Sequence, residues 1–199
     1  LEQGKHVTVV EMADRILPIQ LNEKGGKAYK KLFEDHGCKF ILSKKASDTH
    51  MNENGEIDYV TLDDGTRIDC ELVIVAAGVR PALECIQGTN IEADRFITVS
   101  DSMQTNVPDI YAAGDVTGLS GIWPNAMKQG QTAGYNMCGV KTQYIDKYAM
   151  KNTMNFYGLT TLSLGRGIEE EGDVIVERED SHNYRRAILR DGKLDSILL

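Results

Sequence analysis

The sequence predicts an α/β fold followed by a small α+β module, and two patterns carry this prediction. Residues 7–42 alternate a β-branched strand, an amphipathic helix and a second strand, which is the β-α-β pattern of a parallel sheet. From Tyr144 onward the chain changes to short strand-like segments divided by glycines, which predicts a separate α+β or mostly β module. A length of 199 residues allows one large domain or two smaller ones.

The β-α-β unit is marked by its residue types. The first strand, Val7–Val10, is rich in valine and ends in Glu11, and we expect it to be buried on both faces. A helix is predicted from Asn22, which suits the N-cap, to His36, and Gly37 is expected to end it. Cys38–Leu42 then forms the second strand.

The sequence predicts short antiparallel strands in the middle of the chain, followed by two apolar strands. Turn signals at 52–55 and 63–65 flank the strand Ile57–Leu62, which indicates two or three short antiparallel strands. The continuous apolar run Leu72–Ala77 is expected to be a fully buried strand, and Ile110–Ala113 a second apolar strand.

The last part of the chain holds one predicted helix and several short strands. The helix is expected from about Asn125 to Met137, with Gly139 stopping it. The strands expected in the C-terminal module are Thr153–Tyr157, Leu159–Leu164, Val174–Val176 and Arg186–Leu189.

Composition and charge exclude several classes of protein. The net charge of −8 and pI of about 5.0 argue against a binder of nucleic acid or of an anionic membrane, which need clustered Lys and Arg. No apolar run approaches the roughly 20 residues of a membrane span, and no signal peptide opens the chain. The four cysteines are too far apart for a disulfide framework, a zinc site or a dithiol pair. We therefore expect a soluble, cytoplasmic protein with no metal site.

An acid at the end of the first strand is a candidate ligand for a nicotinamide dinucleotide. Glu11 stands where such β-α-β units place an acceptor for the ribose hydroxyls, about 20 residues after a Gly-rich phosphate loop. None of the nineteen glycines forms a GxGxxG loop. An acid there repels a 2′-phosphate and favours NADH over NADPH, although nearby Arg15 softens this preference. The alternative is a solvated acid at a strand end.

The stretch Thr105–Val116 is the most informative part of the chain. Its Ala-Ala-Gly sequence lets the backbone approach a ligand closely, because no large side chain intervenes. Asp115 follows directly, and its carboxylate would repel a pyrophosphate but would accept hydrogen bonds from sugar-alcohol hydroxyls. The alternative is that Asp115 only caps the following turn.

This stretch resembles the second FAD-binding fingerprint of the FAD-dependent pyridine nucleotide–disulfide oxidoreductases, in which the Asp holds the ribityl chain of the flavin. Further segments resemble the same superfamily in the same order along the chain, and they span nearly all 199 residues. They are Val7–Pro18, Leu62–Pro81 with Gly78, Trp123–Ala126 with Gln129, Gly130 and Ala133, and Leu189–Leu199. The subgroup that the chain most resembles lacks an active-site CxxC and comprises NADH:rubredoxin reductases, NADH oxidases and the flavoprotein part of assimilatory nitrite reductases.

The resemblance implies a domain plan and a set of ligand contacts. Residues 1–77 would be a partial, Rossmann-like NAD(H)-binding domain, 78–147 the returning part of the FAD-binding domain, and 148–199 a small C-terminal interface domain. It implies FAD contacts at Gly114, Asp115 and Gly78 and at a helix start, Asn125 and Ala126, whose unpaired N–H groups would face the flavin. Glu11 would bind the NADH ribose. The small residues of that helix would suit either the flavin or simple helix packing.

The function that the resemblance implies is transfer of hydride from NADH to FAD and of electrons on to an acceptor. The acceptor would be a small redox protein, oxygen or a downstream domain, and no side chain of this chain needs to act as acid, base or nucleophile. The Gly-rich loops of the family are missing, so the chain resembles the C-terminal half of such an enzyme. Two alternatives stay open: a catalytically silent scaffold or dimerisation unit, or a chain that pairs with a separately made N-terminal half.

Overall fold

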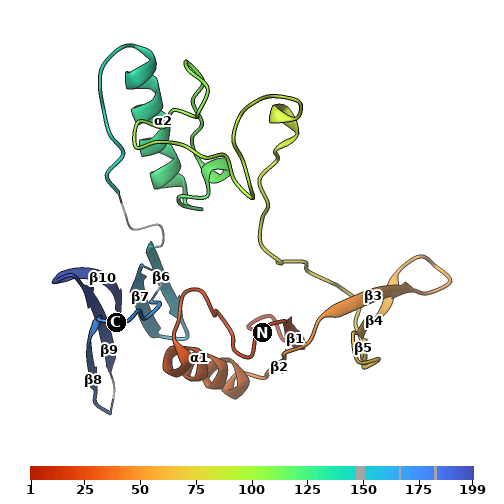
Figure 1. The fold of residues 1–199 in the computed structure, drawn as a ribbon. Coiled ribbons are helices and arrows are strands. Elements are labelled where there is room, and N and C mark those ends of the chain that lie inside the picture. The colour runs from red at the N-terminus through yellow and green to blue at the C-terminus, as the bar shows by residue number, and fades with distance from the viewer. Residues whose placement is uncertain (147–150, 166, 182) are drawn as a thin grey trace. The chain divides into compact units, whose positions relative to one another are not determined.

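The computed structural model describes residues 1–146, 151–165, 167–181 and 183–199 (Figure 1). Contacts divide the chain into two compact units. The first unit comprises residues 1–77 together with 155–159, and the second comprises 78–154 and 160–199. The division into domains at 1–77, 78–147 and 148–199 stays a prediction.

The first unit begins with the predicted β-α-β pattern. Strands β1 (Val7–Glu11) and β2 (Cys38–Leu42) pair in parallel, and α1 (Glu23–Asp35) connects them. The Asn22 side chain accepts a hydrogen bond from the Gly25 N–H at 3.0 Å, which confirms the N-cap. Burial of β1 on both faces was a wrong expectation, because the sheet has only these two strands among the described residues and leaves Val9 36% exposed.

Helix α1 packs through aromatic side chains on the chain segment around Tyr157. Tyr29 is 1% exposed, and its hydroxyl donates to the Leu159 carbonyl oxygen at 3.0 Å. The Phe33 ring centroid lies 5.2 Å from that of Phe156 and 5.6 Å from that of Tyr157. These contacts bring residues 155–159 into the first unit.

Three antiparallel strands follow, as the turn signals predict. They are β3 (Ala46–Met51), β4 (Ile57–Leu62) and β5 (Arg67–Asp69), with β4 in the centre. Val60 and Leu62 of β4 supply the buried side chains of this small sheet.

Two predicted strands are absent from the described residues. The run Leu72–Ala77 forms no strand, and Leu72, Ile74 and Val75 are 72%, 80% and 83% exposed. Ile110–Ala113 forms only an isolated bridge between Tyr111 and Gln104. Strand formation needs a neighbour that supplies hydrogen bonds, and within the described residues Leu72–Ala77 has none. Ile110–Ala113 does pair with residues 103–105, but the pairing does not extend beyond this single bridge.

The last part of the chain forms a five-stranded sheet with the strand order β6-β7-β10-β9-β8. The strand bounds are β6 Lys151–Phe156, β7 Leu159–Leu164, β8 Val174–Glu179, β9 Tyr184–Arg190 and β10 Lys193–Leu198. Strand β10 lies in the centre and was predicted only by the resemblance of Leu189–Leu199 to a strand pair. Buried side chains alternate along β7, β9 and β10, as in a sheet with one covered face.

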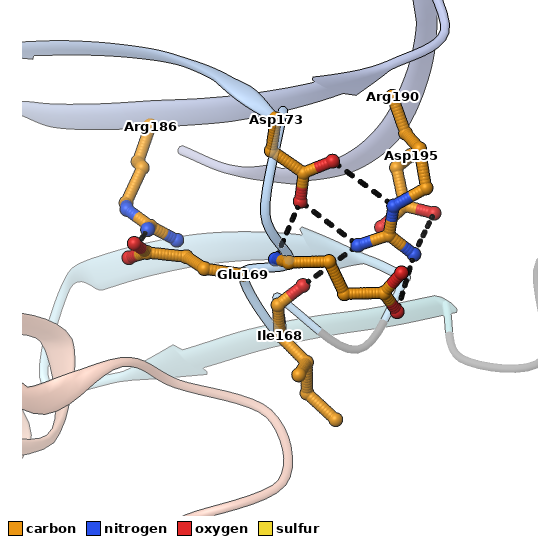
Figure 2. A network of polar contacts seen from close by, with 7 residues as sticks. Ile168, Glu169, Asp173, Arg186, Arg190 and Asp195 are labelled. Carbon is orange, nitrogen blue, oxygen red and sulfur yellow. Dashed lines mark hydrogen bonds and ion pairs between the residues drawn. The ribbon is translucent and has the colours of Figure 1, made fainter.

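A cluster formed by Arg190 with Glu170, Asp173 and Asp195 joins the segment that precedes β8 to this sheet (Figure 2). Arg190 of β9 donates to both carboxylate oxygens of Asp173 at 3.0 and 2.9 Å and to the Ile168 carbonyl at 3.1 Å. Its guanidinium also lies 2.9 Å from Glu170 and 3.5 Å from Asp195 of β10. The Asp173 side chain is only 2% exposed, so this carboxylate depends on Arg190 for its counter-charge.

Because of this cluster, we expect part of the free energy of unfolding to be lost at acidic pH. The hydrogen bonds from Arg190 hold the pKa of Asp173 below its ordinary 3.8. A carboxyl with a depressed folded pKa stabilises the fold above its unfolded pKa, and this contribution is lost as the pH falls through the folded pKa. Arg190→Met should therefore lower the urea midpoint at pH 7 and flatten its dependence on pH below about 4. Equal pH slopes in Arg190→Met and the unchanged chain would contradict this. Exposed Arg178 of β8 offers the control, Arg178→Met.

Candidate functional site

The Gly114–Asp115 turn follows the bridge at Tyr111 and leads into a short 3-10 helix, η2 (Asp115–Thr117), of which Asp115 is the first residue. Gly114 has φ 85° and ψ −156°, a conformation that only glycine adopts without strain. A Cβ added at Gly114 would lie 3.7 Å from the methyl group of Ala126. This is an ordinary van der Waals distance, so it is the φ of Gly114, and not the space beside α2, that favours glycine here.

All the backbone polar groups of Gly114 are used within the chain. Its N–H donates to Gln129 Oε1 at 2.7 Å. Its carbonyl oxygen accepts from the Thr117 N–H at 3.0 Å and lies 2.8 Å from the Thr117 hydroxyl. The turn is therefore held rigidly from both sides.

Asp115 stands at the surface of this turn. Its side chain is exposed, and no described residue donates a hydrogen bond to its carboxylate. The backbone carbonyl of Asp115, and not its side chain, accepts from the Gly118 N–H at 3.1 Å. The carboxylate therefore remains available to a ligand, and it does not cap the turn within the described structure.

Helix α2 (Trp123–Met137) has its polar side inward and much of its apolar side outward. Asn125 and Gln129 are fully buried, whereas Trp123 is 79% and Met127 51% exposed. Buried polar groups need partners, and these side chains find them in loops. Asn125 Nδ2 donates to the Tyr144 hydroxyl at 3.0 Å, and Gln129 accepts from Gly114.

The start of α2 corrects one expectation. The helix begins at Trp123, two residues before the predicted start, with Pro124 in its first turn. The N–H groups of Asn125 and Ala126 both donate to the Ile122 carbonyl at 3.1 Å. The expectation that these N–H groups are unpaired is therefore wrong.

Two of the small residues on α2 face open space. A Cβ added at Gly130 or Gly134 would meet no atom within 4 Å. Packing inside the described structure therefore does not require glycine at these positions. Ala133, in contrast, is 5% exposed and belongs to the buried side of the helix.

Glu11 and Gly78 lie in other parts of the chain. Glu11 ends β1 in the first unit, and its Oε1 accepts from the Ala13 N–H at 2.8 Å. Nearby Arg15 lies 3.2 Å from the Asp14 carboxylate. Gly78 has φ 82° and lies in the exposed segment that follows Leu72–Ala77. The structure thus assembles Gly114, Asp115, Asn125 and Ala126 around α2 and describes Glu11 and Gly78 separately.

Sequence reasoning gave no role to two residues that hold the turn, Gln129 of α2 and Thr117. Gln129 bridges the helix to Gly114, and Thr117 is 7% exposed with its hydroxyl 3.1 Å from Gln129 Oε1. A pattern in the sequence could have identified Gln129 as an inward-facing residue. Polar residues recur at helical spacing along α2, at Asn125, Gln129, Thr132 and Asn136. They occupy the face that an amphipathic helix normally reserves for apolar residues.

The turn and α2 fit a group that carries a polyhydroxyl chain. Asp115 offers an exposed carboxylate that no described residue engages, and Gly114 presents a backbone without a side chain. Gln129 Nε2 is buried and has no acceptor among the described residues. A metal fits less well, because the described residues contain no group of three or more His, Cys, Asp or Glu side chains placed to hold one.

The fold agrees with the comparisons. The family model for pyridine nucleotide-disulphide oxidoreductases matches residues 1–130, and the chain belongs to this family. The family comprises oxidoreductases that bind FAD and NAD(P)H.

Several relatives align with almost the whole chain. The epsilon subunit of NADH-dependent phenylglyoxylate dehydrogenase from Aromatoleum evansii is 30% identical over 99% of the chain and 49% of its own length. NADH-rubredoxin oxidoreductase from Clostridium acetobutylicum is 28% identical over 98% of the chain and 48% of its own length. The chain thus spans about half the length of these relatives.

Solved structures give the same picture. The crystal structure of the Clostridium acetobutylicum NADH:rubredoxin oxidoreductase has a TM-score of 0.68 and 28% identity, and it matches 99% of the chain and 49% of the solved one. A ferredoxin reductase from Rhodopseudomonas palustris has a TM-score of 0.81 at 22% identity, with 99% of the chain and 50% of the solved chain covered. The latter likeness shows the fold. In the described part of this chain, no helix combines the length and apolarity needed to span a membrane.

Proposed function

We propose that this chain is part of a flavoprotein that transfers hydride from NADH to FAD and passes electrons to an acceptor. The observation that carries the proposal is the Gly114–Asp115 turn, in which a rigid backbone presents an exposed carboxylate beside α2. The family membership and the length of its relatives support it, since the chain covers about half of each.

In this proposal the protein binds and orients, because bound FAD itself supplies the hydride-accepting chemistry. The Asp115 carboxylate would accept hydrogen bonds from the hydroxyls of the ribityl chain, because a carboxylate attracts hydroxyl donors and repels the negative charge of a phosphate. Gly114 keeps the backbone free of a side chain at that point. The N-terminal end of α2, at Trp123 and Pro124, adds a positive partial charge that favours negative charge nearby.

Glu11 is the proposed ligand of the NADH ribose. Its carboxylate lies at the carboxyl end of a parallel strand, where such units bind nucleotides. The Arg15 guanidinium, which would favour a 2′-phosphate, lies against Asp14 and donates to the Pro18 carbonyl at 3.3 Å. These contacts support NADH over NADPH as the donor.

The acceptor, the assembly and a cytoplasmic location are further parts of the proposal. We propose a small redox protein, oxygen or a downstream domain as acceptor, and a homodimer as the assembly. The relative from Clostridium acetobutylicum is named for rubredoxin. The four cysteines are all free, as is usual in the cytoplasm.

A visible absorption spectrum tests the proposal. The purified chain is mixed with FAD, gel-filtered and scanned, and a fusion that places the N-terminal half of the Clostridium acetobutylicum NADH-rubredoxin oxidoreductase before it is treated in the same way. A retained flavin band that NADH bleaches, in either form, supports the proposal. A folded but colourless protein in both forms overturns it and favours the silent-scaffold alternative.

Asp115→Asn should weaken FAD binding about tenfold, because a neutral amide replaces a charged acceptor. The Kd is measured by flavin fluorescence in whichever form retains the flavin. Asp109→Asn is the matched control, since Asp109 is exposed in the same stretch and an asparagine suits its φ of 62°. Equal Kd values in both variants would remove Asp115 from the site.

A further inference from the structure

Gln129 joins the helix and the turn through one oxygen atom. Its Oε1 lies 2.7 Å from the Gly114 nitrogen and 3.1 Å from the Thr117 hydroxyl, and the residue is fully buried. Both partners belong to the turn that presents Asp115. A buried hydrogen bond in a low-dielectric surrounding fixes geometry more firmly than an exposed one.

The position of Asp115 relative to the helix depends on this contact, because the other backbone hydrogen bonds of the turn, such as that from the Ile97 N–H to the Val116 carbonyl at 2.9 Å, do not reach α2. Glycine adopts the conformation of Gly114 without strain but adopts many others as easily, so contacts with the surrounding structure select this one. Thr117 closes the turn upon itself through the Gly114 carbonyl. Only the bond from the Gly114 N–H to Gln129 links that backbone to the helix by a hydrogen bond among the described contacts.

We propose that Gln129 is a positioning residue of the flavin site, which sets the Gly114–Asp115 turn so that the carboxylate meets the polyol. The inference rests on the proposed function for its effect on FAD, and on the structure for its effect on the turn. Gln129 itself would contact no ligand. It acts on binding only through the placement of Asp115.

The first test needs no flavin. Amide hydrogen exchange at Gly114 is followed in the unchanged chain and in Gln129→Met, which keeps the length of the side chain but removes the acceptor. We expect exchange at Gly114 to become at least tenfold faster in Gln129→Met. Gln129→Glu keeps an acceptor oxygen and should restore protection. Gln131→Met, at an exposed position of the same helix, should change nothing.

The second test is a double-mutant cycle on FAD binding. Gln129→Met should raise the Kd for FAD about tenfold when Asp115 is present and leave it unchanged in the Asp115→Asn background, because the route through Asp115 is then closed. A general loss of stability would give the same factor in both backgrounds and would overturn the proposal.

The two tests separate the two proposals. Unchanged exchange at Gly114 in Gln129→Met overturns the role of Gln129, whatever binds to the chain. Faster exchange in a protein that binds no FAD keeps the role of Gln129 in the turn, overturns its role in a flavin site, and refutes the proposed function separately.

Discussion

Replacement of Gly165 by alanine is expected to destabilise the C-terminal sheet by about 3 kcal/mol or more. A Cβ at this position would lie 2.4 Å from the Asp195 carbonyl oxygen and 2.9 Å from the Ser196 Cβ. The φ of 75° adds backbone strain. The obstacle is backbone, so no side-chain rotation relieves it.

The register of the sheet explains the close approach. Strands β7 and β10 pair at Leu164 and Ile197, and β10 has an irregularity between Leu194 and Ser196. The extra residue, Asp195, turns its carbonyl oxygen toward Gly165.

Gly172→Ala is the matched control for Gly165→Ala. Gly172 has a φ of 92°, and a Cβ there would meet no atom within 4 Å, so only the backbone strain of about 1 kcal/mol remains. Urea unfolding followed by circular dichroism measures both variants. If Gly165→Ala loses no more stability than Gly172→Ala, the Asp195 carbonyl does not exclude a side chain at position 165, and the prediction is contradicted.

Tyr29→Ala is expected to cost the first unit about 3–5 kcal/mol, as is usual when a large buried side chain is truncated to alanine. Tyr29 is 1% exposed and packs edge-on against Phe156 with ring centroids 5.9 Å apart. The truncation removes the central contact between α1 and residues 155–159 and leaves the Leu159 carbonyl without its donor.

Tyr29→Phe separates the two contributions. It keeps the ring contacts and deletes only the hydroxyl, which should cost about 1 kcal/mol. Tyr135→Ala is the exposed control, because Tyr135 of α2 is 55% exposed. Tryptic cleavage after residues of α1, followed by mass spectrometry, reports the local opening. Cleavage of Tyr29→Ala no faster than that of Tyr135→Ala would show that Tyr29 does not hold this contact.

The strands and helices that proved predictable are those whose partners lie close in sequence. Asn22 and Gly37 bound α1 as expected, since capping depends on a few adjacent backbone groups. The turns at 52–55 and 63–65 place β3, β4 and β5 side by side, because a hairpin encodes its own pairing.

The failures concern segments whose hydrogen bonds depend on distant neighbours. The run Leu72–Ala77 has the residue types of a buried strand, yet it is exposed and unpaired within the described residues. Apolar composition gives a strand its preference for burial, but a neighbouring strand must supply the hydrogen bonds. Ile110–Ala113 differs, because it has a partner close in sequence, residues 103–105, but their pairing stops at a single bridge.

For the candidate site, the sequence by itself determined the chemistry, namely an aspartate directly after a small-residue stretch and before a helix. Residue type fixes which groups can accept hydrogen bonds from a polyol, and motif order fixes the family. Only the tertiary structure decided how Asp115 is presented. The left-handed turn at Gly114 and the inward polar side of α2 arise from contacts between Gln129 and a turn fifteen residues earlier in the chain. Such a contact depends on how two elements pack in the fold. The sequence around a side chain does not specify which distant backbone group that side chain will contact.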